Sequence, residues 1–199
     1  MQKIKWNDGN TLMIEGNCCF NIKKDTKLLF PEGKICGEVW LESLDLQEMI
    51  KHAKSMEEKD YTIPIVCNSI WLEQNRMNLF LQNRDLFEKV VVLPYERGQA
   101  LDEKTYWRCF QRIMECINDV PKEMLVIDLV MGTTISSETK TIESYVSILK
   151  TLNQEGYQTL ISLDNYKFHS KDQRKDENLL ALYETLKEKD LTYLLSLNN

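Results

Sequence analysis

The sequence has few glycines and lacks the short motifs that usually mark a nucleotide, metal or nucleophile site. Glycine accounts for 7 of the 199 residues, which is half the usual share of about 7%. This low content counts against a glycine-rich phosphate loop, and neither a GxGxxG motif nor a Walker lysine loop occurs. The motifs HExxH, GxSxG and CxxC are also absent, which argues against a zincin, an α/β-hydrolase nucleophile and a zinc knuckle.

The chain also lacks a long apolar run and an excess of positive charge. No apolar stretch approaches the roughly 18 residues of a membrane-spanning helix, and the first residues contain no apolar signal-peptide core. Lys and Arg number 25 against 31 Asp and Glu, so the net charge is −6, which disfavours non-specific binding to nucleic acid. We therefore expect a cytoplasmic protein that binds neither membranes nor nucleic acid.

The overall composition is that of a globular domain. Hydrophobic residues make up 43% of the chain and charged residues 28%, an ordinary balance that argues against intrinsic disorder. The six cysteines come without a secretory signal, so we expect reduced thiols rather than a disulfide framework.

Strand-like and helix-like segments alternate from Ile35 to the end of the chain. Strands are predicted at 35–41, 62–67, 90–93, 124–131, 159–163 and 191–197. Amphipathic helices are predicted between them, including one capped by Asp102 and one ending at Gly156. Apolar strands alternating with such helices indicate a parallel sheet covered by helices. Periodicity leaves two architectures open, a partial (β/α)6 barrel and an open doubly wound sheet.

The first thirty or so residues have a different pattern from the rest. Asp8-Gly9 lies between the strand-like runs Ile4–Trp6 and Thr11–Ile14, which is a strong signal for a β-hairpin. We therefore divide the chain into an N-terminal β-hairpin extension, 1–34, and an α/β domain of six alternating units, 35–199.

Ligands of parallel α/β folds gather where the strands end, so polar side chains at these positions are the candidates for chemistry. The candidate catalytic residues are Glu96, Asp128, Asp164 and His169. Asp128 is a carboxylate inside an apolar strand, where burial without a partner is costly; we expect it to accept a hydrogen bond from a loop amide, with catalysis as the alternative. Asp164 and His169 form either a metal or acid–base pair or an ordinary polar loop.

Several segments resemble the core of radical SAM enzymes. Ile35–Leu41, followed by a helix-like stretch, looks like the family's unit in which a GGEP-type motif ends a strand. Ile65–Leu72 resembles the strand ending in Thr-Asn-Gly, Phe87–Leu93 the strand that continues to Ser-Leu-Asp, and Val130–Gly132 the core of the fifth-strand motif.

This resemblance covers roughly residues 11–165 and implies a partial (β/α)6 barrel, which agrees with the six strands counted from the pattern. It also implies three contacts to S-adenosylmethionine, made by Gly37 and Glu38 at the amino group and by Gly132 at the adenine.

The sequence departs from the family at the motif that binds the iron–sulfur cluster. CxxxCxxC is absent, and after Cys18 the next two ligand positions hold Ile22 and Asp25. In the GGEP-type motif, Cys36 replaces the first glycine and Val39 the proline. In the family the cluster supplies the electron that cleaves S-adenosylmethionine, so its loss removes that chemistry.

These observations give three hypotheses for function. The first is a radical-SAM-like barrel without iron–sulfur chemistry of its own and without a cofactor, acting as a binding or accessory subunit for a partner protein or a peptide substrate. The second is an active enzyme that holds a [4Fe-4S] cluster and S-adenosylmethionine through a non-standard ligand set drawn from Cys18, Cys19, Cys36 and Cys67. The third is a generic α/β metal-dependent hydrolase.

Overall fold

The computed structural model describes residues 11–14, 17–22, 37–57, 64–96, 102–130, 139–162, 185–186 and 189–197. The strands are β1 (Thr11–Ile14), β2 (Asn17–Asn21), β3 (Val39–Glu42), β4 (Ile65–Ile70), β5 (Lys89–Val92), β6 (Leu125–Asp128), β7 (Gln158–Ser162) and β8 (Tyr193–Leu197). The helices are α1 (Leu46–Glu57), α2 (Gln74–Leu81), α3 (Glu103–Cys116) and α4 (Thr139–Gln154), with short 3-10 turns at Arg84–Leu86 and Lys122–Met124.

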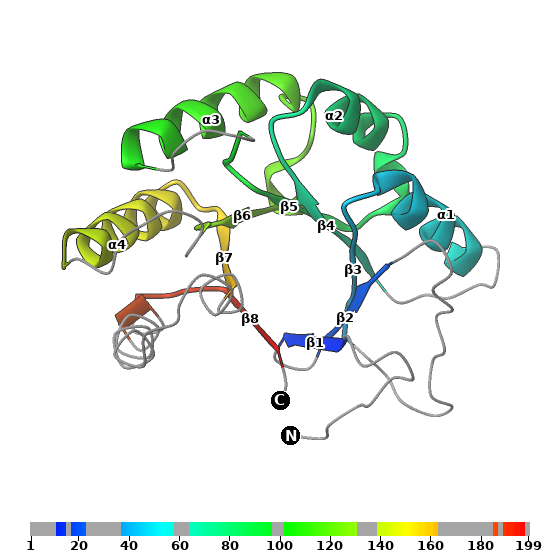
Figure 1. Cartoon of the computed structure of the whole chain (residues 1–199), viewed down its shortest axis with the longest axis horizontal. Helices are drawn as coiled ribbons and strands as arrows, with labels where there is room; N and C mark the ends of the chain where they lie inside the picture. Colours follow the sequence, from blue (N-terminus) through cyan, green and yellow to red (C-terminus); the bar gives the residue numbers. More distant parts are fainter. Residues whose placement is uncertain are drawn as a thin grey trace.

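The strands follow one another around a ring in the order of the sequence (Figure 1). Strands β2 to β8 pair in parallel, each with the next. This parallel sheet is by itself a partial barrel, because its two edge strands, β2 and β8, do not pair with each other. Strand β1 lies between them, antiparallel to both, and completes the ring.

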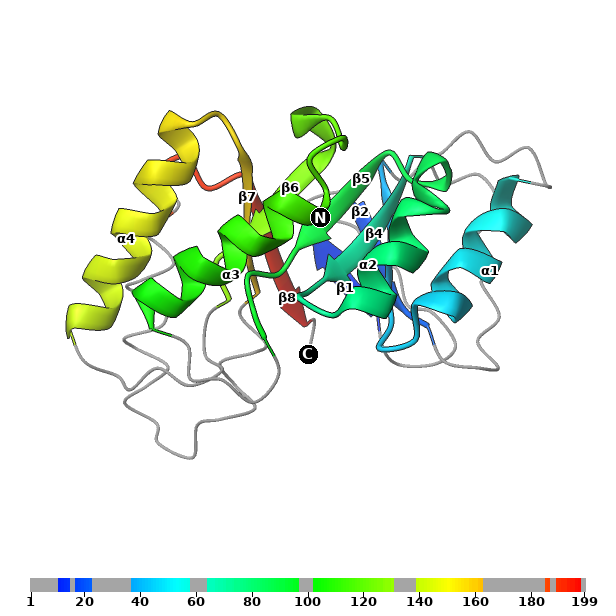
Figure 2. The ribbon, with the colours of Figure 1, turned by 90° about the horizontal axis from the view of Figure 1, so that it is seen from above.

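The predicted α/β barrel is therefore confirmed, and the open doubly wound alternative is not what the chain forms. Helices α1 to α4 all lie outside the curled sheet rather than on both faces of an open one (Figures 1 and 2). All six strands predicted after residue 35 are present, as β3 to β8.

The largest difference in strand position concerns β3, which was predicted at 35–41 and begins at Val39. The Val39 amide donates to the carbonyl of Pro64 (2.9 Å), just before β4 begins. Proline has no N–H with which to continue this parallel ladder toward Glu38. Glu38 consequently precedes β3 instead of following the strand.

The N-terminal strands belong to the same sheet as the rest of the barrel. Strands β1 and β2 form an antiparallel hairpin, and β2 pairs with β3. The hairpin predicted at Asp8-Gly9 falls in residues 1–10, outside the described residues, as does the segment 23–36 that contains the predicted boundary at residue 34.

The core has two layers because strand side chains alternate between the faces of a sheet. The outer layer packs alternate strand residues against the helices. The inner layer fills the ring and consists of Trp40, Val66, Val91, Val126 and Leu160, with Tyr193 packed against it. Every second residue along a strand therefore faces the interior, which places Glu42 and Asp128 one step beyond Trp40 and Val126, toward the carboxyl ends of the strands.

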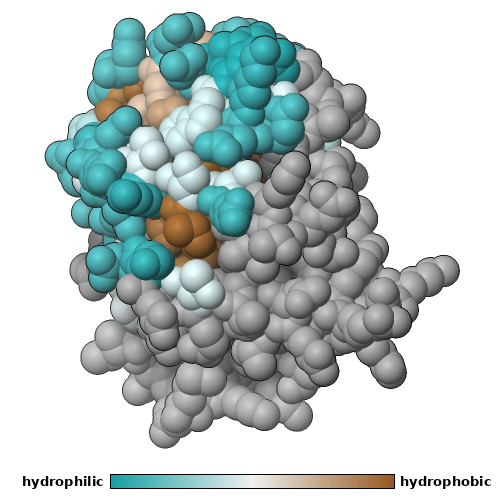
Figure 3. Space-filling view, turned by 90° about the vertical axis from the view of Figure 1, so that its left-hand side faces the viewer, coloured by the Kyte–Doolittle hydropathy of each residue, from teal (hydrophilic) through white to brown (hydrophobic). Residues whose placement is uncertain are grey.

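The outer surface on the side of α4 is mainly hydrophilic where the structure describes it, with small hydrophobic areas between the polar side chains (Figure 3). Among the described helices, none combines the length and apolar character that crossing a membrane requires.

Candidate functional site

The carboxyl end of β6 places an acidic side chain in the interior of the barrel. Asp128 is only 4% exposed, and its Oδ1 accepts a hydrogen bond from the Val130 amide (2.7 Å). The Tyr106 hydroxyl of α3 donates to the Asp128 backbone carbonyl (3.1 Å). The hydrogen bond to a loop amide that the sequence predicted for Asp128 is therefore confirmed.

Burial changes the acidity of this carboxyl group. Desolvation raises the pKa of Asp128 to about 7, the Val130 amide opposes that shift, and the negative charge of Glu42 adds to it. A carboxyl group whose pKa lies near neutrality can both donate and accept a proton at physiological pH, which is what general acid–base catalysis requires.

Glu42 is a neighbour of Asp128 that was not among the candidate residues of the sequence. It ends β3 and is half-buried. The strand was expected to end one residue earlier, at Leu41, so Glu42 fell outside the predicted strand. The alternation that begins at the inward-facing Trp40 is the signal that would have found it.

The backbone is strained at two points on this end of the barrel. Val130, two residues beyond β6, has φ 51°, and Ser69 in β4 has φ 138°. A β-branched residue rarely adopts positive φ, and such conformations concentrate at functional sites. Ser69 lies where the register between β4 and β5 shifts, between Asn68 and Ile70; a bulge of this kind re-aims side chains beside active sites.

A buried arginine joins the loop that follows β3 to the end of β4. Arg76 of α2 is 5% exposed. Its Nη1 donates to the Leu44 carbonyl (2.8 Å), its Nη2 to the Ser43 carbonyl (2.8 Å), and both Nε and Nη2 to the Ser69 carbonyl (3.1 and 2.9 Å). The guanidinium also lies 3.8 Å from the centre of the Trp71 ring. The contact to Ser43 and Leu44 could not be predicted from the sequence, because these backbone carbonyls lie 33 and 32 residues away in the chain.

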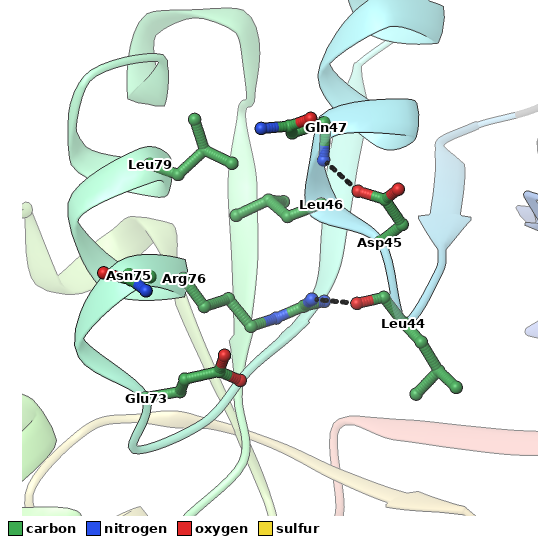
Figure 4. A pocket seen from close by; sticks show the side chains of 8 residues that line it. All are labelled: Leu44, Asp45, Leu46, Gln47, Glu73, Asn75, Arg76 and Leu79. Carbon is green, nitrogen blue, oxygen red and sulfur yellow. Dashed lines mark hydrogen bonds between the residues drawn. The ribbon is translucent and has the colours of Figure 1, made fainter.

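A pocket of about 410 Å³ opens between these two loops and the helices that follow them (Figure 4). It is lined by Leu44, Asp45, Leu46, Gln47, Glu73, Asn75, Arg76 and Leu79. The Arg76 side chain crosses from α2 to the Leu44 carbonyl on the opposite loop (Figure 4). The pocket thus adjoins the same end of the barrel as Glu42 and Asp128.

The opposite, amino-terminal end of the ring is closed by a polar network. Lys89 at the start of β5 pairs with Glu38 and donates to the Tyr193 hydroxyl (2.6 Å). Trp40 donates from its indole N–H to the other Glu38 oxygen (3.0 Å). Burial alone would lower the pKa of Lys89, but these hydrogen bonds and the charge of Glu38 raise it above its usual value. Lys89 is therefore held as a cation, and its role here is structural.

Of the residues expected to contact S-adenosylmethionine, the structure describes Gly37 and Glu38. Glu38, expected at the ligand's amino group, lies at the amino end of the barrel and is engaged by Lys89. Gly37 beside it is exposed. Val130 lies beyond the carboxyl end of β6, and Gly132 follows it outside the described residues. Glu38 is therefore engaged in an ion pair of the barrel itself, and the contact expected at Gly132 stays a prediction.

Of the four cysteines proposed as cluster ligands, Cys67 does not fit that role. Cys67 is fully buried in the outer core layer, and burial raises the pKa of its thiol to about 12; a thiolate ligand needs the opposite shift. Cys18 and Cys19 are adjacent in β2, in register with Val39 and Trp40, and Cys36 lies outside the described residues. The described residues contain no group of three or more His, Cys, Asp and Glu side chains that could hold a metal ion.

The remaining catalytic candidates do not join Asp128 in the part of the chain described. Glu96 follows β5 and accepts a hydrogen bond from Arg112 of α3 (3.2 Å) on the outside of the barrel. Asp164 and His169 lie in 163–184, outside the described residues.

No protein family model matches the chain, and no curated protein is similar enough to be matched. One similar solved structure is a glycerophosphoryl diester phosphodiesterase from Parabacteroides distasonis, with a TM-score of 0.45 and 11% identity over 80% of this chain and 46% of that chain. Another is a dihydropteroate synthase from Xanthomonas albilineans, with a TM-score of 0.49 and 10% identity over 81% and 73%.

The chain spans about half the length of the phosphodiesterase. At these similarities we take no activity from either enzyme, and neither links the chain to radical SAM enzymes. The strand pairings themselves define this chain as an α/β barrel.

Proposed function

We propose that the chain is a hydrolytic enzyme that uses two carboxyl groups, Asp128 and Glu42, at the carboxyl-terminal opening of the barrel. The observation that carries this proposal is the buried Asp128 carboxyl group, which ends an interior strand and has a pKa of about 7. Catalytic groups of α/β barrels lie at this end of the strands. A buried carboxyl group that keeps its proton near neutral pH, beside a second carboxyl group, is a recurring acid–base arrangement.

The two groups have different roles in the proposed reaction. Glu42, the carboxylate, accepts a proton from the attacking water, whose oxygen forms the new bond to the electrophilic centre of the substrate. Asp128, protonated, donates its proton to the leaving atom as the bond to that atom breaks. The proton held by Glu42 then returns to Asp128 through solvent, so the enzyme is regenerated without a co-reactant.

The test is a survey of chromogenic substrates with single-residue variants. We expect turnover of one class among 4-nitrophenyl acetate, 4-nitrophenyl phosphate, bis(4-nitrophenyl) phosphate and 4-nitrophenyl glucoside, measured with and without Mg²⁺. The rate should fall above pH 7 as Asp128 ionises. Asp128→Asn should lower kcat by about 10²–10⁴, whereas Glu115→Gln, on the exposed surface of α3, should not. Equal rates in the Asp128→Asn variant and the parent chain would sink the proposal.

A second candidate is the binding or accessory barrel for a partner protein or peptide. It is favoured by the pocket beside the barrel opening, where Leu44 is 89% exposed. In this candidate the chain has no iron–sulfur chemistry of its own, because Cys67 and Glu38 are positioned for other roles. An iron and sulfide assay after anaerobic reconstitution tests that part: about four irons per chain would overturn it.

A further inference from the structure

We propose that the pocket between the β3–α1 and β4–α2 loops is a docking site for a cationic peptide segment, one that presents a lysine or arginine beside an apolar residue. This inference is independent of the acid–base proposal, since it requires binding and no chemistry. It assigns a specific surface to the partner or peptide that the sequence analysis expected.

The pocket is held open by internal contacts of the barrel. Arg76 bonds the carbonyls of Ser43 and Leu44 on one side and of Ser69 on the other. Asp45 fixes the start of α1 by accepting from the Gln47 amide (2.9 Å). On the other loop, the Trp71 indole donates to Glu73 (3.0 Å). A site built this way requires little ordering when a ligand arrives, which favours binding.

The charges around the pocket favour a cation over an anion. Each of the three guanidinium nitrogens of Arg76 already donates to a backbone carbonyl, so Arg76 is not poised to hold an anionic ligand. The other charged residues of the lining are Asp45 and Glu73, both exposed. Two carboxylates against one buried guanidinium leave a net negative rim, complementary to a lysine or arginine side chain.

The apolar part of the pocket explains why we propose a peptide rather than a small cation. Leu44 is the large hydrophobic side chain that is exposed among the described residues, at 89%, and Leu46 and Leu79 also line the pocket. The volume of about 410 Å³ falls within the range of about 300–1,000 Å³ that is typical of ligand sites. Leu44 follows Glu42 by two residues, so a segment docked here would lie next to the barrel opening.

Fluorescence anisotropy with labelled octapeptides tests the proposal. We expect an alternating Leu-Lys peptide to bind the full chain and to weaken as salt rises, while matched Leu-Glu and Leu-Gln peptides bind at least about tenfold more weakly. Equal binding of the Leu-Glu peptide, or no binding of the Leu-Lys peptide, would overturn the proposal. The readout requires no substrate, so it is unaffected by whether the hydrolysis described above occurs.

A matched pair of double variants separates this pocket from general charge attraction. Asp45→Asn with Glu73→Gln removes both rim charges but keeps acceptors for the Gln47 amide and the Trp71 indole. It should weaken Leu-Lys binding about tenfold. Glu115→Gln with Glu123→Gln makes the same charge change at exposed positions outside the pocket and should leave binding within about twofold. Equal losses of binding in the two double variants would contradict a specific site. A third variant, Leu44→Gln, tests the apolar contact: it should weaken binding of the Leu-Lys peptide while leaving the charges unchanged.

Discussion

At the scale of single residues, Asp128 shows how burial changes the chemistry of a common side chain. An exposed aspartate is ionised at neutral pH, but the interior of the barrel offers Asp128 one amide hydrogen bond and little water. The neutral form is consequently favoured, and the group retains its proton up to a pH of about 7.

This shift predicts a pH-dependent cost to stability. The folded pKa of about 7 exceeds the unfolded value of about 3.9, so the folded chain binds more protons in between. The free energy of unfolding should therefore fall as the pH rises from about 4 to 7. Asp128→Asn keeps an oxygen for the Val130 amide and cannot ionise. Near pH 4 the free energy of unfolding of this variant should equal that of the parent chain. Above pH 7 it should be higher by up to about 4 kcal/mol, as measured by urea unfolding.

The control for this prediction is Asp85→Asn, at a fully exposed carboxylate. Because solvent screens a fully exposed carboxylate, the free energy of unfolding of this variant should stay close to that of the parent chain. If the difference in free energy of unfolding between Asp128→Asn and the parent chain did not change with pH, the pKa of the Asp128 carboxyl group would not be raised by folding.

Arg76 allows a second prediction at this scale. Removing a buried group that satisfies three carbonyls leaves those oxygens without a donor, which is costly. Arg76→Met should lower the free energy of unfolding by about 2–4 kcal/mol, and Arg76→Lys by less. Arg84→Met, which removes a more exposed arginine paired with Asp119 (2.7 Å), should cost under about 1 kcal/mol. Similar losses for Arg76→Met and Arg84→Met in urea unfolding would show that the buried contacts contribute little.

At the scale of elements, helix α3 contacts the sheet through the hydroxyl of Tyr106 and carries part of a row of aromatic contacts. Tyr106 donates to the carbonyl of Asp128, and Tyr106, Trp107, Phe110 and Tyr157 meet edge to face in succession. These contacts tie α3 to the segment that carries the proposed acid.

Removing this tie should affect the site as well as stability. Tyr106→Phe keeps the ring and deletes the hydroxyl, leaving the buried Asp128 carbonyl without that donor, so we expect a loss of about 1–3 kcal/mol. Trp107→Phe changes a half-buried neighbour but leaves the Tyr106 hydroxyl in place, so it serves as the control. In ¹³C NMR titrations the Asp128 carboxyl pKa should move in Tyr106→Phe and stay within about 0.3 units in Trp107→Phe. An unchanged Asp128 pKa in Tyr106→Phe would show that the contact between α3 and the Asp128 carbonyl has no effect on the acidity of the carboxyl group.

Element boundaries show what local sequence patterns can and cannot predict. The cap of α3 was predicted at Asp102, and its carboxylate accepts from the Thr105 amide (2.6 Å); this signal is local and was confirmed. The start of β3 was predicted wrongly, because it depends on Pro64, which directly precedes the neighbouring strand β4. The start of β3 lies four residues after its predicted position, so Glu38 precedes the strand. The end lies one residue after its predicted position, which left Glu42 outside the predicted strand.

At the scale of the whole molecule, β1 closes a ring that the parallel strands leave open. It contacts β8 through Leu12 and Met13 and contacts β2 along its full length. Proline between two paired strands removes a ladder donor and disturbs both neighbours, so Leu12→Pro should destabilise the chain by about 2–4 kcal/mol.

Hydrogen exchange gives the spatial readout for this variant. Backbone amides of β2 and β8 should lose protection first, whereas those of β4 and β5, across the ring, should retain most of theirs (Figure 1). If all strands lost protection equally, the barrel would unfold as one unit, and β1 would not specifically stabilise its neighbours β2 and β8.

The sequence by itself determined the class of the fold. Apolar strands and amphipathic helices repeat with local periods of about 2.0 and 3.6 residues, and these periods are properties of the chain that need no long-range contact. The same local reading predicted the hydrogen bond of Asp128, because a carboxyl group in an apolar strand requires a partner nearby.

Only the tertiary structure decided which polar residues meet. Asp128 and Glu42 lie 86 residues apart, and Arg76 bonds Ser43 and Leu44 at separations of 33 and 32 residues. Closure by β1 likewise joins the two ends of the described chain. Such neighbours arise from the register between strands and the curvature of the sheet, which depend on contacts between distant segments and leave no periodic trace in the sequence.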